Sequence, residues 1–293
     1  MNQTTTVAKK VRHLLLALLT GRKQHESSSP AHPEPVEGLE RDLLHSYGST
    51  SSPRAEQYER VAGALGRLTI VLFILAIPTF LVTSNVRMAF DSLRLYRYGF
   101  EQYNVVRATG LDMAQLMTVA REIRDYFHSS QELLDVRVSL DGEERALFNE
   151  GEILHMRDVK GMVRGVYRIQ EITGAYIVGY VIVVLLATRG RSARALAGRV
   201  IWGSLFTAGL LAFGGLALLV GFDQLFEAFH VLGFASGTYS FDPRYNYLTR
   251  LFTEGFFMQA TLFVTLAVMV QAALLALVAW GIRKWALKRV VSL

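Results

Sequence analysis

The chain has 293 residues, of which 51% are hydrophobic and only 19% charged, and its formal net charge is +6. This balance is unusual for a soluble domain and normal for a protein that crosses a membrane several times. There is no cysteine, which excludes disulfides, cysteine-based metal sites and thiol nucleophiles, and no nucleic-acid-binding motif accompanies the positive charge, so we expect no nucleic-acid partner.

Residues 1–58 are poor in core-forming side chains and are predicted to be a cytoplasmic, largely disordered extension. An apolar stretch at 13–19 follows several basic residues and predicts a short amphipathic helix on the inner leaflet. The stretch 27–53 is rich in Ser, Pro, Gly and His, which predicts disorder. The histidines of this region are interpreted as solvated: His13, His25, His32 and His45.

Four uncharged apolar runs predict four transmembrane helices. Each run is near or above the ~20 residues needed to cross a hydrocarbon layer of ~30 Å. A buried helix of a soluble protein would explain any one of them, but four together favour a membrane protein. The runs are 68–86, 172–188, 200–222 and 255–281.

Basic residues predict the orientation of these helices, because Lys and Arg concentrate in short cytoplasmic loops. They cluster before the first run, between the second and third runs, and after the fourth. We therefore expect both ends of the chain in the cytoplasm. The predicted organisation is a first transmembrane helix in 59–86, an extracytoplasmic cap in 87–171, the second and third helices in 172–222, an outer loop in 223–254, and a fourth helix with a basic tail in 255–293.

The predicted cap is small and of the α+β type. Its first helix, at 93–103, is rich in tyrosine, which is favoured at the membrane interface. Asp112 followed by Gln115 is typical of a capping box and predicts a second helix. Alternating apolar residues in 136–148, interrupted by an Asp-Gly pair, predict a β-hairpin. The fold class is thus an all-α membrane protein with four transmembrane helices, both termini inside, and a small extracytoplasmic α+β cap.

The cap is predicted to end in a helix that carries His155. Asn149 with Glu152 is a second capping box and marks the start of this helix. Glu152, His155 and Asp158 share one helical face, so either carboxylate could orient the imidazole and raise its basicity. The competing interpretation is a surface histidine in a local network of charges.

A second histidine, His230, follows the third apolar run. It is predicted to share a helical face with Phe226, Glu227 and Phe234. An interfacial histidine that anchors a helix end is the alternative. His155 and His230 are 230 − 155 = 75 positions apart, yet the topology places both at the same boundary between water and lipid. Two imidazoles at that level suggest chemistry on a substrate attached to lipid.

Aromatic residues surround the second histidine in the sequence. They predict either an interfacial aromatic belt or a confined pocket for acyl chains, and both can hold at once. The residues predicted to line this pocket are Phe226, Phe229, Phe234, Tyr239 and Phe241.

Two sequence signatures resemble a bacterial integral membrane family whose characterised branch is the lipoprotein intramolecular transacylase. The first is Glu-Ile-Leu-His-Met-Arg-Asp-Val-Lys at 152–160. The second is Phe229-His230 with Phe234, followed by Phe-Asp-Pro at 241–243 and Phe-Phe at 256–257. The resemblance extends from about Arg67 to the C-terminus. The family's usual Trp after the second histidine is replaced, with Tyr239 as its counterpart, and the usual Pro before the Phe-Phe pair is absent.

The resemblance implies an activity. Such an enzyme moves the sn-2 acyl chain of a diacylglyceryl lipoprotein to the amino group of that lipoprotein's N-terminal cysteine, giving the lyso-form. It implies catalytic roles for His155 and His230, no cofactor, a diacylated lipoprotein and membrane lipid as partners, and an active site at the extracytoplasmic face of the bacterial cytoplasmic membrane. The oligomeric state does not follow from it.

Histidine suits this chemistry, because an imidazole with a pKa of about 6.5 can act as base and acid near neutral pH. His230 is predicted to be the base toward the amine, and His155 to assist the oxyanion and the leaving oxygen. An imidazolium or the Tyr239 hydroxyl could stabilise the oxyanion. No nucleophilic Ser or Cys is required, since the nucleophile and the ester belong to one molecule.

Three other functions compete with this one. The first is another acyltransferase or hydrolase that acts on lipid esters with the same pair of histidines. The second is a non-catalytic protein with an outer two-histidine metal or binding site, completed by Asp158 or Glu227. The third is a transporter, against which the lack of intramembrane charges and broken helices counts.

Overall fold

The computed structural model describes residues 53–140, 142–234 and 241–291. The predicted helix at 13–19 and the four N-terminal histidines lie outside these ranges. The last residues of the predicted N-terminal extension, from Pro53 on, are helical and form the start of the first long helix.

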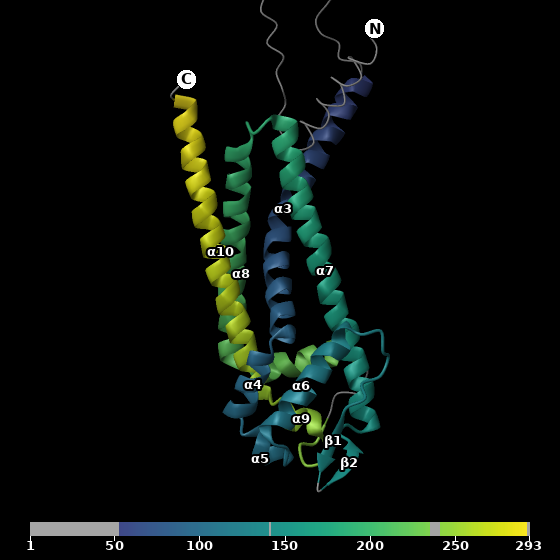
Figure 1. Ribbon diagram of the computed structural model, residues 1–293. Coiled ribbons are helices and arrows are strands. Elements are labelled where there is room, and N and C mark those ends of the chain that lie inside the picture. The colour runs from purple at the N-terminus through teal and green to yellow at the C-terminus, as the bar shows by residue number, and fades with distance from the viewer. Residues whose placement is uncertain (1–52, 141, 235–240, 292–293) are drawn as a thin grey trace, which may run out of the picture.

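Four long helices form the body of the molecule (Figure 1). All four contain a segment long and apolar enough to cross a membrane, which confirms the four predicted spans. Both described ends of the chain lie at the end of the bundle opposite the short elements, as does the turn between the second and third long helices (Figure 1). The helices are α3 (Pro53–Asp91), α7 (Glu150–Thr188), α8 (Ala193–Gly233) and α10 (Glu254–Val291).

The helix α7 is longer than the sequence predicts. The predicted cap helix and the second transmembrane helix are one continuous helix of 39 residues, about 59 Å long at 1.5 Å per residue. The predicted boundary between 171 and 172 therefore falls inside α7. Because the helix does not break there, the position of His155 is fixed rigidly relative to the membrane segment.

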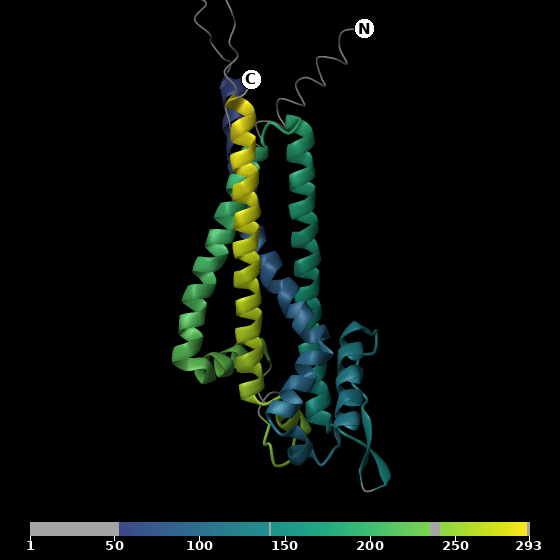
Figure 2. The same ribbon diagram turned by 60° about the vertical axis from the view of Figure 1, so that its left-hand side comes forward.

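The helix α8 is kinked at Gly221, whose backbone angles are not helical (φ −167°, ψ 64°). Beyond the kink the chain turns across the end of the bundle (Figure 2). The predicted third span ends at this point, but the following residues are helical as well. The segment after the kink, rather than a loop, carries His230.

Small residues allow the long helices to approach closely. A Cβ atom on Gly174 of α7 would lie 2.8 Å from the Phe80 ring of α3, and one on Gly203 of α8 would lie 3.2 Å from the Ile74 carbonyl oxygen. Three other glycines of α8 do not serve such an approach, because a Cβ atom on each would find open space: Gly209, Gly214 and Gly215.

A reciprocal pair of amide side chains joins α3 and α10 inside the bundle. Asn85 Nδ2 donates to Gln271 Oε1 at 2.8 Å, and Gln271 Nε2 donates back to Asn85 Oδ1 at 3.1 Å. Two amides that satisfy each other are tolerated in an apolar surrounding where a single amide would cost free energy.

The short elements form the cap at one end of the bundle (Figure 1). Both predicted capping boxes are present, at Asp112–Gln115 and Asn149–Glu152. The predicted hairpin is also confirmed, with Leu140 paired to Glu143 across the turn, although Asp141 lies outside the described residues. The cap elements are α4 (Leu93–Gln102), α5 (Val105–Thr109), α6 (Met113–His128), β1 (Arg137–Leu140), β2 (Glu143–Ala146) and α9 (Tyr247–Leu251).

The core of the cap is shared with the long helices. Phe100, Leu116 and Ile123 from the cap pack in one buried cluster with Met156 of α7 and Leu251 of α9. Because α7 contributes to this core, the cap and the membrane helices hold each other in place. The start of α7 is therefore buried within the cap.

Candidate active site

His155 lies in the second turn of α7, at the point where the helix enters the cap core. The capping box at Asn149 fixes where the helix begins, so the register of His155 follows from the sequence. Its side chain is only 9% exposed, and the next residue, Met156, is buried in the cap core.

His230 reaches the same place from the segment of α8 beyond the kink. The two imidazole rings lie nearly parallel, with centroids 6.3 Å apart and an angle of 16° between their planes. The structure thus brings together two histidines separated by 75 positions in the chain. The turn at Gly221 makes this possible, because a straight α8 would carry His230 away from α7.

Aromatic rings enclose both histidines. The Phe234 ring lies against both, with its centroid 4.6 Å from that of His155 and 5.4 Å from that of His230. Phe226 lies 4.3 Å from His230, and Phe241 lies 5.3 Å from His155. Of the remaining predicted pocket residues, Phe229 packs edge-on against His230 at 5.4 Å, while Tyr239 lies outside the described residues.

One hydrogen bond sets the tautomer of His230. Its Nδ1 atom lies 2.7 Å from the carbonyl oxygen of Phe226. A carbonyl oxygen can only accept, so Nδ1 must carry the hydrogen. In the neutral ring the lone pair is then on Nε2, which is the atom that can take up a proton.

Glu152 is buried, with 1% of its surface exposed, and both of its carboxylate oxygens bind the backbone. Oε2 accepts from the Asn149 N–H at 2.9 Å, and Oε1 accepts from the Leu248 N–H at 2.8 Å. The predicted role was to orient the His155 imidazole. The structure instead shows Glu152 joining the start of α7 to the start of α9.

The other two predicted orienting carboxylates lie away from the imidazoles. Asp158 Oδ1 is 3.6 Å from Nε of its neighbour Arg157. Glu227 is exposed on α8. Within the described residues, no hydrogen bond or ion pair joins either carboxylate to His155 or His230. In the same part of the chain, no group of three or more His, Asp or Glu side chains could hold a metal ion.

The turn that follows Phe241 was not predicted from the sequence. Asp242 accepts hydrogen bonds from the Arg244 N–H and side chain, at 2.9 Å and 2.6 Å, and these bonds hold the pKa of its carboxyl below the ordinary value. The Asp242 N–H in turn donates to Asn246 Oδ1 at 3.0 Å. This turn connects Phe241 beside His155 to α9, whose Leu248 N–H donates to Glu152. The Asp-Pro pair after Phe241 was the available signal, because such pairs begin turns.

A family model and solved structures match this chain. The family model of the lipoprotein intramolecular transacylase Lit matches residues 70–257, a range that includes both histidines. Among curated proteins, none matches this chain in sequence.

Solved structures of one protein share the fold. The lipoprotein intramolecular transacylase Lit from Bacillus cereus superposes with a TM-score of 0.63 at 16% identity, covering 79% of this chain and 100% of that chain. A variant of it with a histidine replaced by arginine gives 0.61 at 18% identity, over 81% and 98% of the two chains. A variant with the same histidine replaced by alanine gives 0.62 at 17%, over 80% and 99%.

Proposed function

The chain belongs to the lipoprotein intramolecular transacylase family, and we propose that it moves the sn-2 acyl chain of a diacylglyceryl lipoprotein to the amino group of the N-terminal cysteine of that lipoprotein, giving the lyso-form. One observation carries this proposal: the His155 and His230 rings lie 6.3 Å apart inside an aromatic enclosure where the transmembrane helices meet the cap.

His230 is the general base. Its Nδ1–H group is held by the Phe226 carbonyl, so Nε2 can accept a proton from the substrate's amino group. The amine attacks in its neutral form, and as its nitrogen bonds to the carbonyl carbon of the sn-2 ester it passes one proton to Nε2, so that a tetrahedral intermediate with a negatively charged oxygen forms. The chain needs no nucleophile of its own for this step.

His155 is the general acid. In its protonated form it stabilises the oxyanion and then gives its proton to the glyceryl oxygen as the ester C–O bond breaks. One amide bond forms, one ester bond breaks, and one proton passes from the amine to the glyceryl oxygen by way of the two imidazoles. A proton returns from His230 to His155 before the next turnover.

The phenylalanines around the two rings position the substrate. Phe226, Phe234 and Phe241 present apolar surface to acyl chains and exclude water that would hydrolyse the ester. Phe229 is 52% exposed and extends this surface toward the outside of the bundle. Positioning of two groups of one molecule can supply an effective molarity of ~10⁵–10⁸ M, so orientation accounts for much of the rate.

The orientation in the membrane belongs to the same proposal. The turn between α7 and α8 contains Arg189 and Arg191, Arg194 follows at the start of α8, and this turn lies at the end of the bundle opposite the cap. By the positive-inside rule that end is cytoplasmic. The cap and the two histidines then face the outer side of the bacterial cytoplasmic membrane.

The test is expression of the chain in a bacterium whose lipoproteins are otherwise diacylated, with mass spectrometry of one lipoprotein's N-terminal peptide. We expect an N-acyl, S-monoacylglyceryl cysteine with the intact chain. The His155→Ala and His230→Ala variants should each lose product by roughly 10²–10⁴-fold, the usual contribution of general acid–base catalysis.

The matched control is His128→Ala. His128 is a partly exposed histidine of the cap that pairs with Asp91 and does not belong to the aromatic enclosure. This variant should retain activity. Unchanged diacylglyceryl cysteine in the presence of folded protein would contradict the proposal, and analysis of the extracted lipids would then show whether another lipid ester is the substrate.

A further inference from the structure

The helix α4 lies across the cap-side ends of the transmembrane helices and carries two arginines, Arg94 and Arg97 (Figure 1). It follows α3 directly, since the first membrane segment ends at Asp91. The ring of Tyr98 packs edge-on against Phe263 of α10, with centroids 5.5 Å apart. This contact places α4 beside the cap-side part of the apolar segment of α10.

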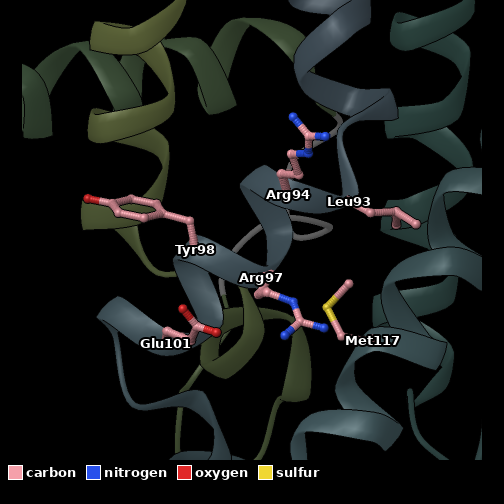
Figure 3. Close-up of a pocket in the computed structure, with 6 residues that line it drawn as sticks. All are labelled: Leu93, Arg94, Arg97, Tyr98, Glu101 and Met117. Carbon is pink, nitrogen blue, oxygen red and sulfur yellow. The ribbon is translucent and has the colours of Figure 1, made fainter.

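A hollow of about 320 Å³ opens beside this helix. Figure 3 shows its lining, with the Arg97 guanidinium next to the Met117 side chain and the Tyr98 ring directed toward α10. The volume is near the lower limit of small-molecule sites, which suits a head group better than a drug-sized ligand. The lining residues are Leu93, Arg94, Arg97, Tyr98 and Glu101 of α4 and Met117 of α6.

The charges of this hollow are not balanced within the protein. In the described ranges, neither Arg94 nor Arg97 forms an ion pair, although Glu101 follows Arg97 by one helical turn. Two arginines and one glutamate leave a net charge of +1. That charge matches a phosphodiester, which carries one negative charge at neutral pH. Arginine is also the side chain whose planar fork binds phosphate oxygens in pairs.

We propose that this hollow binds the phosphodiester head group of a membrane phospholipid. The Arg94 and Arg97 guanidinium groups donate hydrogen bonds to the phosphate oxygens, and Glu101 accepts one from a hydroxyl or ammonium group beyond the phosphate. Leu93, Tyr98 and Met117 contact the glycerol and the upper part of the acyl chains. The site shares no lining residue with the enclosure around His155 and His230, so it is a second lipid site of the protein.

The test is a lipid titration of the delipidated full chain in detergent, followed by native mass spectrometry. The probe is short-chain phosphatidylglycerol. The Arg94→Gln/Arg97→Gln variant should bind it roughly 25-fold more weakly, because each basic side chain near an anionic lipid contributes roughly fivefold. The matched control is Arg107→Gln/Arg145→Gln, which removes the same charge from exposed positions elsewhere in the cap and should leave the affinity unchanged.

Further ligands separate the possible sources of the affinity. Diacylglycerol, which has no phosphate, and inorganic phosphate, which has no acyl chain, should each bind far more weakly than phosphatidylglycerol. Phosphatidylcholine has no hydrogen-bond donor beyond its phosphate, so it should bind more weakly than phosphatidylglycerol. Glu101→Ala, which removes the acceptor, should bring the affinities for the two lipids closer together. An equal loss in the control variant, or inorganic phosphate binding as tightly as the lipid, would overturn the proposal.

The single variants Arg94→Lys and Arg97→Lys cover the case in which the double variant does not fold. They retain the charge and lose only the planar fork. Each should weaken binding of the lipid severalfold with an unchanged thermal transition. Affinity equal to that of the wild type in both lysine variants would contradict phosphate binding by the two guanidinium groups.

Discussion

Glu152 joins two helices that border the candidate site. Its two carboxylate oxygens accept hydrogen bonds from one N–H group at the start of α7 and one in α9, and the side chain is buried. Glutamine has only one acceptor oxygen, so Glu152→Gln would direct an NH₂ group at a backbone N–H. We expect a loss of about 1.5–3 kcal/mol of unfolding free energy, the usual contribution of a hydrogen bond to a charged group. Thermal unfolding in detergent measures this change.

Glu150→Gln is the matched control for that prediction. Glu150 is an exposed acidic residue in the same first turn of α7. Its replacement removes a negative charge that interacts just as favourably with the N-terminal end of the helix. Its effect should stay within about 0.5 kcal/mol, as for ordinary surface substitutions. Equal melting temperatures for the two variants would show that the buried carboxylate does not support the site.

At the scale of single residues, the sequence predicted whatever depends on local spacing. Both bonds of the Asn149–Glu152 capping box were foreseen, because they join positions three residues apart. The second partner of Glu152, the Leu248 N–H, could not be foreseen, since every residue except proline has the same backbone donor. For the same reason Glu152 was predicted to orient the His155 imidazole. A carboxylate that accepts hydrogen bonds from backbone N–H groups leaves no trace in the pattern of side chains.

At the scale of elements, the contact between α4 and α10 depends on Gly99. A Cβ atom on Gly99 would lie 2.7 Å from Cε2 of the Phe256 ring, closer than atoms pack. Gly99→Ala should therefore lower the unfolding free energy by about 1–3 kcal/mol through overpacking. Gly161→Ala is the control, because a Cβ atom there finds open space and alanine is the better helix former. A Gly99→Ala variant as stable as the control would mean that Phe256 moves aside freely.

Element boundaries were harder to predict than element types. An apolar run shows which part of a helix faces lipid. The helix itself continues as far as its backbone N–H and C=O groups remain hydrogen-bonded to each other. This is why α7 begins at Glu150, well before the predicted start of the second transmembrane helix at 172, and why the segment of α8 beyond Gly221 is helical. The helices α5 and α9 have five residues each, which is too short for a helical period to appear in a sequence.

At the scale of the whole molecule, the proposed orientation can be tested because the chain has no cysteine of its own. Ser130 is exposed in the cap, and Ala195 is exposed at the start of α8 at the opposite end of the bundle. In intact cells a membrane-impermeant maleimide should label the Ser130→Cys variant. The Ala195→Cys variant should react only after the membrane is opened. The reverse pattern would place the histidines on the cytoplasmic side and exclude the proposed substrate.

The architecture of the whole chain was the most predictable feature, since four apolar runs of sufficient length leave few alternatives. The meeting of the two histidines was suggested by topology alone, because both were placed at one membrane boundary. Their stacking geometry depends on the kink at Gly221, which no local pattern indicates.

The bond between Glu152 and Leu248 also fixes an order of events during synthesis. Its partners are 96 positions apart, and both histidines leave the ribosome before Leu248 does. A nascent chain that ends between His230 and Leu248 contains both histidines but lacks the α9 donor that anchors the start of α7. The start of α7 therefore gains this anchor only after the first three membrane segments have been synthesised.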